Sequence, residues 1–161
     1  MRNNKPRRIT TKYIDYIPIH SLKSNTGNLN IIENGLRCYD FSNGQYADLS
    51  FNLHPGYVNS TPIKIELIVG KKIDDAHSNI KFKLEIKPIL GGSEVIESNH
   101  ILDCKENGFK YILLHTFKHI KSKENVNQTI HLCRITRMPV SEPHPNSIWI
   151  YGIQITYNYT L

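Results

Sequence analysis

The chain of 161 residues has a hydrophobic fraction of 39%, which suits one domain with a buried core and excludes a disordered composition. Its formal net charge of +6 permits binding to nucleic acid, to an anionic surface or to an acidic partner, although the basic residues are mostly scattered. No apolar run approaches transmembrane length, and no apolar signal region follows the basic first residues, so we expect neither a membrane span nor a secretory signal.

Residues 1–30 differ in composition from the rest of the chain and are interpreted as an extended N-terminal arm. Four basic residues fall within the first eight positions, and a run of apolar, β-forming residues follows them. Pro18 favours an extended conformation over a helix. Large side chains such as Tyr13 and Tyr16 are costly to leave in water, so the arm is expected to lie on its own domain or on a neighbouring subunit. We predict that contact with another protein chain orders residues 9–20.

From residue 31 onward, apolar and polar residues alternate with a period of two, which is typical of strands with one buried face. Eight strands are predicted, at residues 36–41, 47–53, 62–70, 79–88, 94–102, 109–117, 129–138 and 147–159. The alternation is clearest in 79–88, where Lys81, Lys83 and Lys87 fall on one face, as on a solvated sheet. No segment has a convincing helical pattern, so the crossovers that parallel strands need are not available.

These strands predict a single all-β domain over residues 31–161, an antiparallel eight-stranded jelly-roll β-sandwich. An immunoglobulin-like sandwich is the alternative, but its Cys…Trp…Cys signature is missing. The last strand begins apolar on both sides, with Ile148 and Ile150 on one face and a longer row on the other: Trp149, Tyr151, Ile153, Ile155, Tyr157 and Tyr159. This pattern indicates a central strand, or one whose outer face meets another subunit.

The sequence does not predict catalysis, a cofactor or a metal site. His115 and His119 are four residues apart, but they lie in an expected strand and its exit, without a third ligand. No GxSxG motif, reactive cysteine motif or phosphate-binding glycine loop occurs, and Asp74-Asp75 is interpreted as a turn. The three cysteines are widely spaced without a CxxC, which favours reduced thiols over a disulfide framework. We therefore expect a non-enzymatic protein that acts through its surfaces.

Two patterns near the end of the chain carry a resemblance to a known family. The penultimate strand has a hydrophobic-Arg-Ile-x-Arg pattern, formed with Arg134, Ile135 and Arg137. The last strand has an aliphatic-x-Gly-aliphatic-x-aliphatic-x-Tyr pattern, formed with Gly152, Ile153, Ile155 and Tyr157. Together with residues 46–69, these patterns resemble small jelly-roll structural proteins of tailed bacteriophages.

The resemblance implies a structural component of a virus particle, either a head decoration or fibre protein or a tail or collar protein. It further implies a protein made in the host cytoplasm and located in the virion, where it assembles as a symmetric homo-oligomer, with a trimer favoured. Other virion proteins would bind the arm. The basic residues of the arm also permit a few phosphate contacts, so nucleic acid is possible but not favoured.

Nine residues are candidates for contacts with another subunit or partner: Arg7, Arg8, Tyr13, Tyr16, Ile17, Arg134, Arg137, Trp149 and Tyr151. Arg134 and Arg137 lie on opposite faces of one expected strand. One could pair with an acidic neighbour across the sheet, and the other could sit at a subunit boundary, where arginine is favoured.

The alternative function is a carbohydrate-binding β-sandwich module. Such a module should carry a planar platform of Trp or Tyr on a concave face or a loop. The single tryptophan, Trp149, lies within the last expected strand, which favours the structural role over this alternative.

Overall fold

The computed structural model describes residues 8–18, 22–24, 29–31, 37–59, 61–70, 78–88, 93–103, 109–118, 130–141 and 147–160. Within these ranges every regular element is a β-strand, and no helix there is long and apolar enough to span a membrane. The strands are β1 Thr10–Pro18, β2 Lys23–Ser24, β3 Leu29–Ile31, β4 Arg37–Ser42, β5 Tyr46–Asn52, β6 Pro62–Gly70, β7 Ser78–Pro88, β8 Glu94–Leu102, β9 Phe109–Lys118, β10 Ile130–Met138 and β11 Ser147–Thr160.

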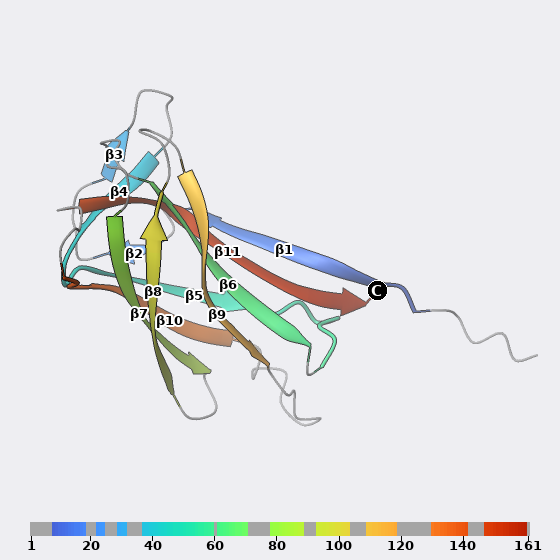
Figure 1. Ribbon diagram of the computed structural model, residues 1–161. Helices are drawn as coiled ribbons and strands as arrows, with labels where there is room; N and C mark the ends of the chain where they lie inside the picture. Colours follow the sequence, from blue (N-terminus) through green and yellow to red (C-terminus); the bar gives the residue numbers. More distant parts are fainter. Residues whose placement is uncertain are drawn as a thin grey trace, which may run out of the picture.

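The strands form two antiparallel sheets that pack as a sandwich (Figure 1). Sheet A has the order β3-β4-β11-β6-β9, with β1 also paired with β11, and sheet B has the order β2-β5-β10-β7-β8. Without β1, β2 and β3, the sheets are β4-β11-β6-β9 and β5-β10-β7-β8, which is the arrangement of an eight-stranded jelly roll. Each of the eight predicted strands is present, and the predicted all-β jelly-roll sandwich is confirmed.

The hydrophobic core lies between the two sheets and follows the alternation of the sequence. In β7, Ile80, Phe82, Leu84 and Ile86 are all buried, as the period of two predicted. The facing strands of sheet A contribute isoleucines and leucines of the same kind, among them Ile63, Ile65 and Leu67 of β6. Because side chains alternate along a strand, the row that does not face this core lies on the outer face of its sheet.

The strand β1 belongs to the sandwich itself. Residues Thr10–Pro18 pair in continuous register with Gly152–Thr160 of β11, beyond the point where β4 stops pairing with that strand. Without β1, the second half of β11 would be an open sheet edge. The contact that the structure shows for these residues is therefore with their own domain, which is one of the two alternatives for the arm. The ordering of residues 9–20 by another protein chain stays a prediction, and residues 19–20 lie outside the described residues. Residues 1–7, at the start of the predicted arm, lie outside the described residues.

A β-bulge in β11 changes which residues share a face. The register of β11 against β6 shifts between Ile150 and Gly152. A one-residue irregularity moves the following side chains to the opposite face. Ile148 and Ile150 therefore share the core with Ile153, whereas Trp149 and Tyr151 form a separate buried cluster with Cys38 and Ile68. The prediction that Trp149, Tyr151 and Ile153 lie on one face is wrong for this reason.

Candidate functional site

The outer face of sheet B carries a shallow depression of about 610 Å³. It crosses β2, β5, β10 and β7, and its polar lining residues are Lys23, Asp48, Ser50, Glu85, Lys87, Ser93 and Arg134. Leu49, Ile86, Leu132 and Cys133 are the apolar residues of the lining. The charged residues and Leu132 occupy outward positions of strands whose inward positions form the core. We call this site the polar depression.

The strand register places the charges of the polar depression in one row. Lys23 of β2 lies opposite Asp48 of β5, Asp48 opposite Arg134 of β10, and Arg134 opposite Glu85 of β7. The sign alternates across the four strands, and cross-strand pairs of opposite charge stabilise a sheet. A second row, one pleat away, holds Ser50, Leu132 and Lys87.

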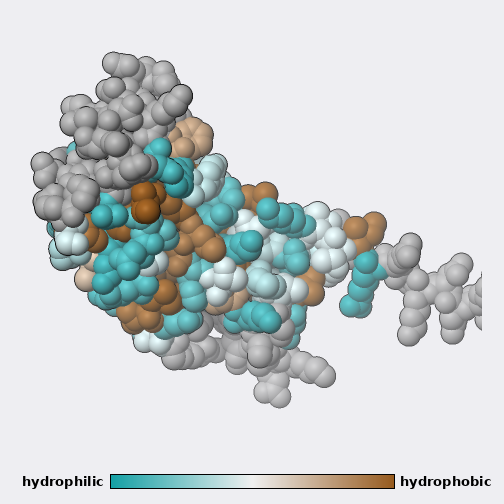
Figure 2. Space-filling model, in the orientation of Figure 1, coloured by the Kyte–Doolittle hydropathy of each residue, from teal (hydrophilic) through white to brown (hydrophobic). Residues whose placement is uncertain are grey.

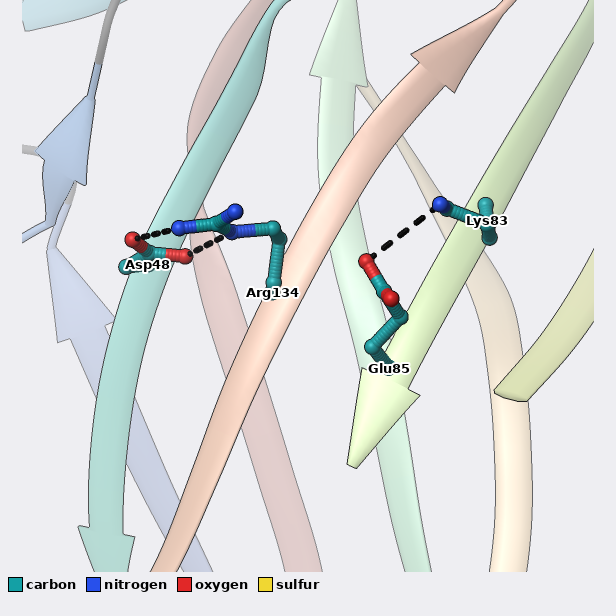
Figure 3. A network of polar contacts seen from close by, with 4 residues as sticks. All are labelled: Asp48, Lys83, Glu85 and Arg134. Carbon is teal, nitrogen blue, oxygen red and sulfur yellow. Dashed lines mark hydrogen bonds and ion pairs between the residues drawn. The ribbon is translucent and has the colours of Figure 1, made fainter. Parts of the chain in front are cut away.

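Arg134 is held in place by two neighbours on β5. Its Nε donates to Oδ1 of Asp48 at 2.7 Å and its Nη2 donates to Oδ2 at 2.8 Å (Figure 3). Its Cζ lies 4.0 Å from the centroid of the Tyr46 ring. The hydrogen bonds that Arg134 donates to Asp48, more than any other contact, raise the pKa of Arg134. This bidentate and stacked geometry fixes a planar cation in the depression before any ligand arrives.

Salt bridges also engage the neighbouring lysines Lys83 and Lys81. Lys83 lies 3.4 Å from Glu85 on the same strand, and Lys81 lies 2.5 Å from Glu97 of β8 (the first pair is drawn in Figure 3). The hydrogen bond from Lys81 is the main cause of the lowered pKa of Glu97. The negative charges of the carboxylates on this face are therefore each balanced by a cation on the same face.

The polar depression can bind a ligand that needs both donors and acceptors. Arg134 and the lysines donate hydrogen bonds, the carboxylates of Asp48 and Glu85 accept them, and Ser50 can do both. Leu132 is 47% exposed among these groups and offers an apolar contact. In the described part of the chain, no group of three His, Cys, Asp or Glu side chains is placed to hold a metal ion.

A second exposed surface lies on the other sheet and its edge. Phe109, Tyr111 and Leu113 of β9 are each about half exposed, and Figure 2 shows hydrophobic atoms gathered where β8 and β9 lie in Figure 1. The ring of Phe109 is inclined at 76° to that of Tyr111 and at 65° to that of Tyr151. Phe109 meets each of the other two rings edge to face, so these rings do not form the planar platform that a stacking site would present.

The structure distributes the nine candidate contact residues over different surroundings. Of the nine, only Arg134 lies in the polar depression. It forms a salt bridge with Asp48 on the neighbouring strand, as expected for one of the two arginines of this strand. Arg8 and Tyr16 are exposed, and Arg7 lies outside the described residues. The others are packed against or within their own sandwich: Tyr13, Ile17, Arg137, Trp149 and Tyr151. The predicted homo-oligomer, and the low preference for nucleic acid, stay predictions.

Sequence reasoning missed most of the polar depression. Lys87 was expected only on a solvated sheet face, and Asp48, Glu85 and Leu132 were not among the candidate site residues. A signal was available in the outward positions of residues 47–53 and 129–138, which alternate with the buried ones. The register that brings these positions together was not readable from the sequence.

The fold is shared with solved structures of xylan-binding domains. No family model and no curated protein matches the chain. The CBM22-2 xylan-binding domain of Paenibacillus barcinonensis Xyn10C is similar over 89% of this chain and 98% of its own, with 14% identity and a TM-score of 0.51. The CBM22-1–CBM22-2 tandem of the same protein matches over 89% of this chain and 49% of its own (13% identity, TM-score 0.53). The CBM22-1 domain alone matches over 87% of each chain, with 10% identity and a TM-score of 0.50.

These likenesses correct the expected function. The prediction of a structural component of a virus particle, whether decoration, fibre, tail or collar protein, is wrong, because the three solved structures compared above, which share this fold, carry xylan-binding domains. The expectation that this chain is not an enzyme stays a prediction.

Proposed function

We propose that this chain is a non-catalytic carbohydrate-binding module and that its ligand lies in the polar depression. The observation that carries the proposal is the fixed arrangement of Arg134 on Asp48 and Tyr46, beside the exposed Leu132. A sugar presents hydroxyl groups that both donate and accept hydrogen bonds, together with apolar C–H faces. The depression offers the complementary set of groups on one sheet face.

Preorganisation supports this site over the aromatic surface of β9. Arg134 and Asp48 fix each other, so a ligand would not have to immobilise a long, free arginine side chain. Their side chains keep 45% and 34% of their surface exposed, which leaves atoms of both within reach of a ligand. The rings of Phe109 and Tyr111 cannot both lie flat against one sugar chain, because their planes are nearly perpendicular.

The proposal is tested by isothermal titration calorimetry against a panel of soluble polysaccharides: xylan, mannan, mixed-linkage β-glucan and polygalacturonate. We expect saturable binding of at least one polymer by the wild-type chain. Losing a hydrogen bond to a charged group costs about 1.5–3 kcal/mol, so Arg134→Ala should weaken binding roughly tenfold to hundredfold.

Lys64→Ala is the matched control, because Lys64 is an exposed cation on β6 of the other sheet. It should bind as the wild type does. Incubation with the bound polymer should release no new reducing ends, as the non-catalytic role requires. The proposal fails if no polysaccharide binds, or if Arg134→Ala and Lys64→Ala bind equally well.

A further inference from the structure

We infer that the polar depression selects glycans that carry carboxylate groups, that is, uronic acid polysaccharides. The inference rests on the proposed carbohydrate-binding function and adds the chemical class of the ligand. It follows from a count of charges and pairs on the outer face of sheet B, and from where the unpaired cations lie.

The described outward positions of this face hold more cations than carboxylates. Five basic side chains point outward from these strands: Lys23, Lys81, Lys83, Lys87 and Arg134. Three carboxylates accompany them: Asp48, Glu85 and Glu97. The face therefore has an excess of two positive charges, which attracts an anionic ligand toward it.

The salt bridges show which cations make up this excess. Asp48 is bound by Arg134, Glu85 lies by Lys83, and Glu97 lies by Lys81, so each carboxylate already has a partner. Within the described residues, Lys23 and Lys87 are in no salt bridge. Both are exposed, and both line the polar depression.

The two unpaired lysines lie on opposite sides of the depression. Lys23 is on β2 and Lys87 is on β7, with β5 and β10 between them. Neighbouring strands are about 4.8 Å apart, so the two backbones are separated by roughly 14 Å. A sugar chain that crosses the strands over Leu132 and Arg134 would meet an ammonium group on each side. The flexible stems of the lysines allow each ammonium to reach a carboxylate along such a chain.

The test compares polygalacturonate with the same polymer after chemical reduction of its carboxyl groups, which keeps the backbone and removes the charge. We expect the acidic form to bind at least about tenfold more tightly at 0.1 M salt. Its advantage should shrink at 1 M salt, where the Debye length falls from about 10 Å to about 3 Å. Lys87→Gln and Lys23→Gln should each weaken binding of the acidic polymer by a larger factor than binding of the carboxyl-reduced polymer, because only the acidic form loses an ion pair.

Lys64→Gln is the matched control, because it removes the same charge from the opposite sheet. The inference is overturned if acidic and reduced polymers bind equally well while binding persists. That result would leave the proposed function standing. A loss in Lys64→Gln as large as that in Lys87→Gln would overturn it as well, since the net charge alone would then explain the preference. Failure to bind any polymer, acidic or neutral, would overturn both proposals.

Discussion

The guanidinium of Arg137 donates through Nη1 to the backbone carbonyl of Phe41 at 2.5 Å, inside the protein. Arg137 is on β10 of sheet B and Phe41 is on β4 of sheet A, so this hydrogen bond joins the two layers. Only 1% of the surface of Arg137 is exposed. Burial lowers its pKa to about 10, partly offset by the charge of Asp40, so the side chain remains cationic at neutral pH.

We predict that Arg137→Ala destabilises the domain severely. The substitution leaves the carbonyl of Phe41 without this donor and removes a buried cation near Asp40, at a cost of about 2–4 kcal/mol in the free energy of unfolding. Urea denaturation followed by tryptophan fluorescence measures it. Arg134→Ala, three residues earlier on the exposed face, should leave the unfolding midpoint nearly unchanged. Equal midpoints for the two variants would show that the buried hydrogen bond is not important for stability.

Tyr13 is predicted to anchor β1 to the sandwich. Its ring stacks on Tyr157 at a centroid distance of 4.9 Å and meets Tyr159 edge to face, and the tilted ring of His54 lies 5.8 Å away. Tyr13→Ala should lower the free energy of unfolding by about 1–3 kcal/mol through lost apolar burial and ring contacts. Lys12→Ala, a neighbouring exposed position on the same strand, should change it little. If both variants unfold at the wild-type urea concentration, β1 adds no stability through this ring.

Gly152→Ala should displace β1. A Cβ at this position would lie 2.8 Å from the backbone oxygen of Ile17 and 2.8 Å from the ring of Tyr16. The strand cannot accept these contacts without moving, and such overpacking costs about 1–3 kcal/mol. Amide hydrogen exchange should therefore accelerate in Thr10–Pro18 while exchange in β7 and β10 stays slow. Asn158→Ala, also on β11 opposite β1, is the control and should leave exchange in β1 unchanged.

Stability should fall on acidification through His100. Burial, and then the charge of Lys110, lowers the pKa of His100 below its ordinary value of 6.5. Below pH 6.5 the unfolded chain therefore takes up this proton before the folded one does, and stability decreases as the pH falls from there through the folded pKa. Unfolding in urea at pH 7.5 and 5.5 should show a smaller loss in His100→Gln than in the wild type. The other histidines are common to both proteins, so identical losses would exclude His100 as a contributor.

Much of the fold could be predicted because one buried row per strand is enough to produce a period of two. The strands of residues 79–88 and 129–138 show this plainly, and both occur as expected. Two features depended on contacts that a sequence does not show. The bulge between Ile150 and Gly152 places Trp149 and Tyr151 on the opposite face from Ile153. The pairing of β1 with the second half of β11 adds a strand to sheet A at a position where β11 would otherwise be an open edge.

The resemblance to phage proteins misled the functional prediction for a physical reason. Its matched residues have structural roles in a jelly roll: Ile135 and Arg137 are buried between the sheets, and Gly152 lies at the bulge beneath Tyr16. Residues of this kind report the architecture, which unrelated functions share. The polar depression depends instead on the strand register that brings Asp48, Arg134 and Lys87 onto one sheet face, and the pattern does not specify that register.

The pairing of β1 with β11 also determines how the domain responds to mechanical load. Thr10 faces Thr160, and the register runs without interruption from there to Pro18 and Gly152. A force that pulls Thr10 away from Thr160 would break the hydrogen-bonded pairs between β1 and β11 one after another. A force along the strand axis would load all of these pairs at once. A module tethered through these two positions would therefore release β1 at low tension, while the eight strands of the jelly roll and the polar depression on sheet B stay assembled.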